Sequence, residues 1–235
     1  YMPRLAEWYT AIARGVEPPP AKATDLRTLY EQEIAYRESK RFQTDREYWA
    51  ERVVGMEEGT SLTGRSAPPA ALNRVASAAL SDSQSRLVDE AAARHESTPA
   101  GLLLAAFAGY LAQWNGAEDV ILSLPVTART TAAMRRSAGV SSNIVPLRLH
   151  VGTDTTTADL LRQVQVEVTG ALRHQRYRHE DIRRDAAGDG VVTRQFYGPW
   201  VNIMLFHDTV ALDDLVGTMH VLSTGSIEDL GVNFY

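Results

Sequence analysis

The stretch that decides the fold class is residues 143–151, with the sequence Asn-Ile-Val-Pro-Leu-Arg-Leu-His-Val. Apolar side chains alternate here with polar ones, which predicts a strand with one buried and one solvated face. From Thr157 the pattern changes to a helical period, with one apolar stripe formed by Leu160, Leu161, Val164, Val168 and Leu172. A strand followed by a helix that can cover it favours an α/β or mixed α+β layered fold.

Outward from this pair, strands and helices continue to alternate. Further strands are expected over residues 75–80, 119–124, 200–206, 219–222 and 230–235. Helices are expected over residues 4–14, 25–39, 44–54, 81–95 and 99–114. Thr24 is the expected N-cap of the second of these helices. Ser81 with Gln84 has the spacing of a capping box, and Thr98 precedes a proline at the first helical position.

Composition excludes several classes of function. Apolar residues make up 44% of the 235 residues, which is enough for a core, and the net charge of −5 gives no electrostatic case for nucleic acid or anionic membrane. Cysteine is absent, so disulfides, thiolate zinc sites and thiol nucleophiles are excluded. His174 and His179 are five residues apart, which is not the spacing of a helical metal site, and no metal is expected. A cytoplasmic location is expected.

Residues 56–71 are rich in Gly, Ser, Thr and Pro and are the expected linker between two lobes. The chain opens Tyr1-Met2-Pro3-Arg4, with no apolar leader segment and no methionine at position 1. We therefore expect it to be a piece of a longer polypeptide.

Four features could carry chemistry, and each has a plainer alternative. Asn202 lies among apolar neighbours, so its amide is either satisfied by the fold or faces a wet cavity. Residues 141–143, Ser-Ser-Asn, form either a turn or a set of donors lining a site. Arg129 is either a surface residue or half of an ion pair between lobes. The charged run 173–185 is either a cation-rich helix end or a surface for an acidic carrier protein.

Six stretches, in order along the chain, resemble the condensation domains of nonribosomal peptide synthetases. They are most similar to the starter subgroup, which N-acylates the first amino acid. The stretches are residues 36–39 with 45–49, 124–129, 139–149, 174–178 with 183–185, 197–206, and 224–230. Each is weak singly, but six in the right order over nearly the whole chain are specific.

The resemblance implies a chloramphenicol-acetyltransferase-like fold in which two lobes meet at a tunnel. Residues 1–55 would be the end of the first lobe, residues 56–71 the linker, and residues 72–235 most of the second lobe. The implied reaction joins an acyl thioester, from acyl-CoA or an acyl carrier protein, to the amine of an aminoacyl thioester on a peptidyl carrier protein. The domain would bind no cofactor of its own, because phosphopantetheine arrives on the carrier proteins. An adenylation domain would adjoin it in the same synthetase.

The family's catalytic motif, H-H-x-x-x-D-G, is not in this sequence, and the resemblance puts it shortly before Tyr1. A degenerate motif there would leave a catalytically inactive domain that recruits a partner enzyme or carrier protein. Ester-forming or epimerising relatives share the tunnel but not the starter-like stretches. Where peptide-extending domains have Pro-Phe-Glu, this chain has Arg178-His179-Glu180, which favours an acyl donor. Leu205 and His207 also depart from the family pattern.

The resemblance also assigns roles to residues. Asn202 matches an Asn that faces the tunnel and is the expected catalytic residue of this chain. Ser142, Asn143 and Met204 are expected to line the substrate channel. Arg129 matches an Arg that pairs with the Asp of the catalytic motif, which is a structural role. The candidates for the carrier-protein surface are Arg176 and Arg178.

Overall fold

The structure is a computed structural model, and it describes residues 2–21, 23–56, 59–63, 74–187, 198–204, 210–218 and 229–235. The helices are α1 (Met2–Ala13), α2 (Leu26–Arg37), α3 (Lys40–Arg52), α4 (Asp82–Arg94), α5 (Pro99–Asn115), α6 (Ala132–Arg135), α7 (Thr157–Arg173) and α8 (His179–Ala187). The strands are β1 (Asp119–Val126), β2 (Asn143–His150), β3 (Trp200–Ile203), β4 (Val210–Leu212), β5 (Leu215–Gly217) and β6 (Gly231–Phe234).

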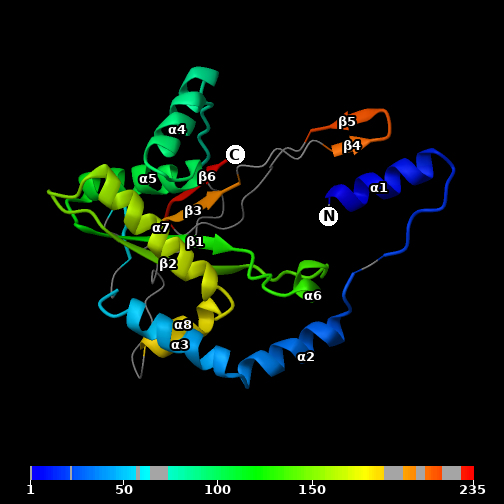
Figure 1. The fold of residues 1–235 in the computed structure, drawn as a ribbon, viewed down its shortest axis with the longest axis horizontal. Coiled ribbons are helices and arrows are strands. Elements are labelled where there is room, and N and C mark those ends of the chain that lie inside the picture. The colour runs from blue at the N-terminus through cyan, green and yellow to red at the C-terminus, as the bar shows by residue number, and fades with distance from the viewer. Residues whose placement is uncertain are drawn as a thin grey trace.

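A four-stranded sheet in the order β2-β1-β3-β6 is the centre of the fold (Figure 1). β1 pairs with β2 in antiparallel fashion from Asp119↔His150 to Val126↔Asn143. β3 lies parallel to β1 on its other edge, and β6 lies parallel to β3, with Asn202 opposite Asn233. The alternation in residues 143–151 is confirmed, because Val145, Leu147 and Leu149 are buried in β2.

Both faces of β1 and β2 are covered. α5 packs on β1, α7 packs on β2, and these two helices contact each other. In Figure 1, α3 and α8 lie on the side of β1 and β2 away from α4 and α5, and Trp49 and Ile182 join the same core. The predicted stripe of α7 is buried at Leu160, Leu161 and Val164, whereas Leu172 at the end of the helix is 45% exposed.

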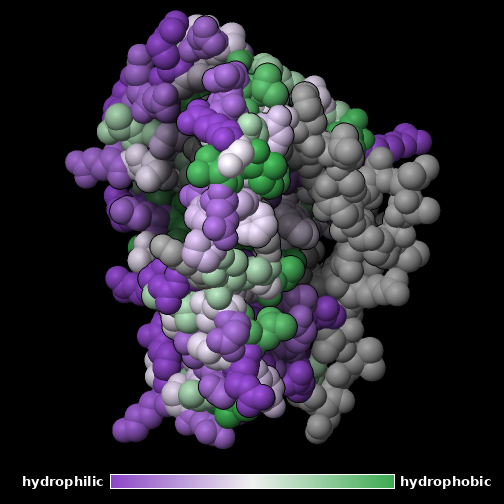
Figure 2. Space-filling model, turned by 90° about the vertical axis from the view of Figure 1, so that its right-hand side faces the viewer, coloured by the Kyte–Doolittle hydropathy of each residue, from purple (hydrophilic) through white to green (hydrophobic). Residues whose placement is uncertain are grey.

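α1 and the hairpin β4–β5 form a separate layer at one end of the molecule (Figure 1). Arg14 joins this hairpin through a 2.6 Å ion pair to Asp213. Figure 2 shows this side of the molecule, where hydrophobic residues lie among hydrophilic ones on the surface. The exposed side chains of α1 include Leu5, Trp8 and Ile12. Within the described ranges, no helix is long and apolar enough to span a bilayer.

Several sequence predictions are confirmed at the residue level. The capping box of Ser81 and Gln84 begins α4, and Thr98 caps α5 with Pro99 in its first turn. The helix expected over residues 4–14 is α1, and the strands expected at 119–124 and 230–235 are β1 and β6.

Other predictions were wrong, for identifiable reasons. Asp25, not Thr24, caps α2, because its carboxylate accepts from Thr28 N, while the Thr24 hydroxyl donates to Ala133 O. α3 begins at Lys40 rather than residue 44, because Ser39 caps it.

The strand expected over residues 75–80 does not form. These residues have no strand partner among the described residues, and their side chains are exposed. α6, α8, β4 and β5 were not predicted. The strand expected over 200–206 is confirmed as far as Ile203. Residues 205–206, the strand expected over 219–222, most of the linker, and residues 224–228 lie outside the described part of the chain.

Candidate functional site

The candidate site lies at one end of the sheet. Because β1 is parallel to β3 and antiparallel to β2, the carboxyl ends of β1 and β3 and the amino end of β2 lie at the same edge. Arg129 follows β1, Ser142 precedes β2, and Met204 follows β3. Strand topology thus brings together residues from three of the six family-like stretches.

Asn202 lies in β3 on the face opposite the apolar core. Its neighbours Val201 and Ile203 pack into or against that core, and side chains alternate along a strand. The Asn202 side chain is only partly buried, and its Nδ2 donates to Asn233 Oδ1 on β6 at 3.3 Å. The fold therefore supplies one partner for the amide and leaves the side chain partly accessible.

Trp200 and Met204 lie two residues before and two residues after Asn202, close to the same site. Trp200 lies two residues before Asn202, so both project from the same face of β3. The Trp200 indole Nε1 is buried and has no hydrogen-bond partner in the described structure. Met204 is partly buried, and its backbone N donates to Phe234 O at 2.8 Å, which continues the β3–β6 pairing by one residue.

Asn143 is buried and hydrogen-bonds to the loop that follows α7. Its Nδ2 donates to Gln175 O at 2.9 Å and to Tyr177 O at 2.7 Å, and its Oδ1 accepts from His179 N at 3.0 Å. The side chain thus fixes the loop of residues 174–178 to the end of β2. That Asn143 also lines a substrate channel stays a prediction.

Ser142 differs from its neighbour because its side chain is exposed. Its carbonyl, with that of Ser141, accepts from Arg178 Nη1 at 3.2 Å. Arg178 therefore ties the same loop to the turn before β2. Its expected contact with a carrier protein stays a prediction, as does the place of Ser142 in the substrate channel.

Arg129 holds the turn between β1 and β2. Its Nη1 donates to Met134 O, Ser137 O and Ser137 Oγ, and its Nη2 donates to Gly139 O at 2.8 Å. No carboxylate of the described residues forms an ion pair with it. The ion pair with the Asp of the catalytic motif stays a prediction, since that motif is not in this sequence.

Arg176 turns toward α2. Its guanidinium lies 4.1 Å from the centre of the Tyr36 ring, and it donates to Gln32 O at 2.7 Å. A longer 3.6 Å ion pair joins it to Glu33. Its side chain is only 14% exposed, so a carrier protein would meet little of it. The carrier-protein role of Arg176 stays a prediction.

The charged run 173–185 is divided between two elements. α7 ends at Arg173, which is the one basic residue of its last turn, and α8 begins at His179. Burial lowers the pKa of His179, and Arg183 adds to that effect against the opposing charge of Glu180.

Sequence reasoning missed a buried polar cluster centred on Asp45 of α3. Its carboxylate accepts from the Tyr36 hydroxyl at 2.8 Å, contacts His174 Nδ1 at 2.7 Å, and pairs with Arg41 Nε at 2.9 Å. Burial and this carboxylate raise the pKa of Tyr36. The Tyr48 ring stacks on His174 at 4.0 Å. The matches at residues 36–39 and 45–49 were the available signal, but they did not indicate the contact with His174.

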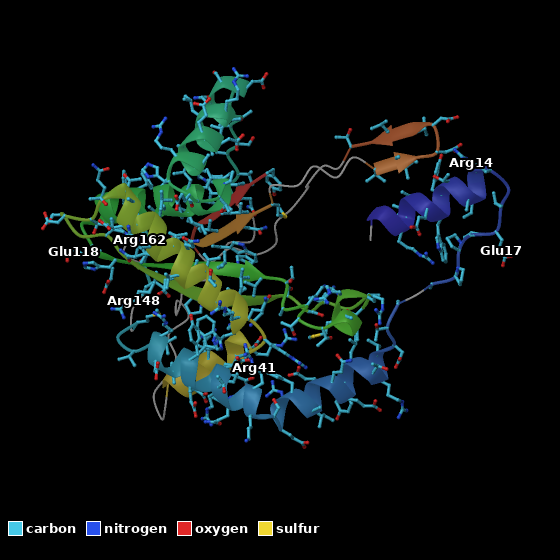
Figure 3. All side chains as sticks on the ribbon, viewed as in Figure 1. Arg14, Glu17, Arg41, Glu118, Arg148 and Arg162 are labelled. Atoms are coloured by element: carbon cyan, nitrogen blue, oxygen red, sulfur yellow. The ribbon has the colours of Figure 1, made fainter. Side chains whose placement is uncertain are left out.

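Two further residues at the site were not predicted. Gln175 Oε1 accepts from Ala128 N, which links the loop after α7 to the end of β1. Asn233 contacts Asn202, and nothing in the sequence near residue 233 indicates that pairing. Farther from the site, Arg148 links Asp119 on β1 to Val54 O after α3, and both Arg148 and Arg41 are labelled in Figure 3. The described residues contain no group of acidic or histidine side chains arranged to hold a metal.

The comparisons with known proteins agree on one family. The family model for the condensation domain matches residues 2–208. The chain is 32% identical over 232 residues to a dimodular nonribosomal peptide synthase of Bacillus subtilis (strain 168), which covers 99% of this chain and 10% of that protein.

Two solved structures extend this likeness to the fold. One is the first condensation domain of the calcium-dependent antibiotic synthetase in complex with a substrate analogue, with a TM-score of 0.88 and 34% identity over 99% of this chain and 51% of that one. The other is a variant of the starter condensation domain of rhizomide synthetase RzmA in complex with C8-CoA and Leu-SNAC. Its TM-score is 0.80, with 30% identity over 99% of this chain and 52% of that one.

The chain spans about half of each solved condensation-domain chain and one tenth of the curated relative. Over that span it has the mixed α/β, chloramphenicol-acetyltransferase-like fold that the resemblance implied. A family model that matches nearly its full length, together with this shared fold, decides the classification: the chain belongs to the condensation domains of nonribosomal peptide synthetases.

Proposed function

We propose that this chain is part of a starter condensation domain, which acylates the amine of an aminoacyl thioester held on a peptidyl carrier protein. The donor is an acyl thioester, either acyl-CoA or an acyl carrier protein, and the product enters nonribosomal lipopeptide biosynthesis. The observation that carries the proposal is the 30% identity, over 99% of this chain, to a starter domain solved with C8-CoA and Leu-SNAC. The Arg178-His179-Glu180 sequence, which resembles the starter subgroup, supports it.

In the proposed reaction, the amine nitrogen attacks the thioester carbonyl. A C–N bond forms, the C–S bond breaks, the nitrogen loses a proton, and the leaving thiolate gains one. The histidine of the family motif, which this sequence does not contain, would orient the amine or accept its proton. Holding the two thioesters in line supplies much of the rate, up to about 7–11 kcal/mol for ideally oriented groups.

Asn202 is the proposed catalytic residue of this chain. Negative charge develops on the thioester carbonyl oxygen as the amine attacks, and a preorganised N–H donor at that oxygen lowers the barrier. The partly accessible Asn202 amide is a neutral donor on the non-core face of β3. Ser142 and Met204, at the same end of the sheet, would line the substrate channel beside it.

The test uses the complete condensation domain with a loaded aminoacyl carrier protein and a panel of acyl-CoA and acyl carrier protein donors. We expect the wild-type domain to form the N-acyl amide, detected by mass spectrometry. The Asn202→Ala variant should lose about 100-fold in kcat, as removal of one oxyanion donor does elsewhere. Ile203→Val, on the adjacent core side of the strand, is the matched control and should stay within about threefold of wild type.

The outcomes separate the two candidate functions. Amide formation by the wild type and its loss in Asn202→Ala support the proposal. If the wild-type domain binds the carrier protein but gives no amide with any donor, the inactive, partner-recruiting alternative is favoured instead. If acylation proceeds and Asn202→Ala is fully active, the reaction stands and the assignment of Asn202 is wrong.

A further inference from the structure

Asn202 does not stand alone on its face of the sheet. β3 and β6 are parallel and in register, so Asn202 lies directly opposite Asn233. Their neighbours Ile203 and Phe234 both pack against the core, so the two asparagines project together from the other face. Both side chains are partly buried, and Asn202 Nδ2 donates to Asn233 Oδ1 at 3.3 Å.

This hydrogen bond restricts what the Asn202 amide can present. An asparagine side chain has two N–H donors and one carbonyl oxygen on a planar group that can turn by half a rotation about its last bond. With one N–H given to Asn233 Oδ1, a turn of the Asn202 amide alone would set two carbonyl oxygens against each other, so the Asn202 amide can reverse only if the Asn233 amide reverses with it. While Asn233 presents its Oδ1 to Asn202, the bond holds the Asn202 amide with its second N–H turned away from Asn233.

We propose that Asn233 is a positioning residue for the condensation reaction: its Oδ1 fixes the Asn202 amide so that the second N–H of Asn202 is directed at the reacting thioester oxygen. This inference rests on the proposed function. Asn233 need not touch the substrate, since its effect passes through Asn202. Small errors in the placement of such a donor are costly, because a misplacement of about 1 Å can cost up to about 100-fold in rate.

If the inference is right, residue 233 must carry a hydrogen-bond acceptor for the Asn202 amide. Asn233→Leu keeps the branched shape of the side chain and removes the acceptor. Asn233→Asp keeps an oxygen acceptor at the same position. A role through Asn202 predicts that the aspartate variant retains more activity than the leucine variant, whereas a role in strand packing alone predicts no such order.

The experiment is a double-mutant cycle in the complete condensation domain, with kcat and KM for acyl transfer from the donor that the wild type uses. We expect Asn233→Leu to lower kcat by about 10-fold or more with KM nearly unchanged, and Asn233→Asp to lose less. In the Asn202→Ala background, Asn233→Leu should have no further effect on kcat, because the amide that it positions is gone. The melting temperature of each variant separates loss of folding from loss of positioning.

Each outcome decides the matter. Equal losses for Asn233→Leu in both backgrounds, or a lowered melting temperature with kcat unchanged, would overturn the inference and leave the proposed function intact. If Asn233→Leu does not fold, the test uses Asn233→Asp alone. The inference is then overturned if Asn233→Asp lowers kcat by about 10-fold or more and lowers it equally in the Asn202→Ala background. Failure of the wild type to form any amide would overturn the proposed function, and this inference with it.

Discussion

Asp45 on α3 and His174 after α7 are 129 residues apart in the sequence, yet Asp45 Oδ1 lies 2.7 Å from His174 Nδ1. Asp45 is 1% exposed, and its other contacts are the Tyr36 hydroxyl and the Arg41 guanidinium. Trp49 adds a second link, because its indole N–H donates to His174 O at 3.0 Å. These contacts fix α3 to the loop of residues 174–178, which in turn contacts the ends of β1 and β2.

Replacement of Asp45 by alanine should therefore destabilise the domain strongly. It removes the acceptor for two buried or partly buried donors and a partner of Arg41, so we expect a loss of about 3–5 kcal/mol in the free energy of unfolding. Urea denaturation followed by tryptophan fluorescence measures it. Glu47→Ala on the exposed side of the same helix is the control, expected within about 0.5 kcal/mol. Similar values for the two variants would contradict the structural role of Asp45.

Asn143 and Ser142 form a matched pair for a second prediction. Asn143→Ala leaves two carbonyls and one N–H of the 175–179 segment without their partner, which should cost about 3 kcal/mol in unfolding free energy. It should also speed amide hydrogen exchange in that segment. Ser142→Ala, at the exposed neighbouring position, should change stability by less than about 0.5 kcal/mol. Unchanged exchange in Asn143→Ala would refute the prediction.

Two glycines should respond to alanine in opposite ways. A Cβ on Gly198 would lie 1.8 Å from Ile121 O, a backbone atom of β1, so Gly198→Ala must separate β1 from the start of β3. We expect a loss of about 3 kcal/mol or more. Gly109 lies inside α5, and a Cβ added there would meet nothing within 4 Å, so Gly109→Ala should stabilise the helix by about 0.5–1 kcal/mol. Thermal denaturation of both variants checks the contrast.

His179 should make stability depend on pH. Burial lowers its pKa from the ordinary value of 6.5, so the unfolded chain takes up a proton at a higher pH than the folded one. Its contribution to stability is therefore complete above about pH 6.5 and declines as pH falls toward its folded-state pKa. Urea denaturation between pH 8 and pH 5 should show this decline, and His179→Gln should reduce it. The exposed His95→Gln is the control, and an equal pH slope in both variants would argue against His179 as the source.

Local patterns in the sequence were enough to predict most elements of this fold. Alternation in residues 143–151, the stripe of α7, and the capping residues Ser81 and Thr98 depend on neighbours within a few positions, so they can be recognised in isolation. The prediction failed at residues 75–80, because a short, mostly apolar stretch becomes a strand only where another strand is available to pair with it. The N-cap of α2 was misassigned for a related reason, since the Thr24 hydroxyl is engaged by Ala133, far along the chain.

The sequence by itself determined which polar residues have apolar neighbours along the chain, and Asn202 was identified in that way. Only the tertiary structure decided the partners: Asn233 for Asn202, the 175–179 backbone for Asn143, α2 for Arg176, and His174 for Asp45. The physical reason is that strand register and helix packing bring together groups separated by tens to more than a hundred residues. Hydrogen bonds depend on distance and direction in space, and no local pattern encodes either across such separations.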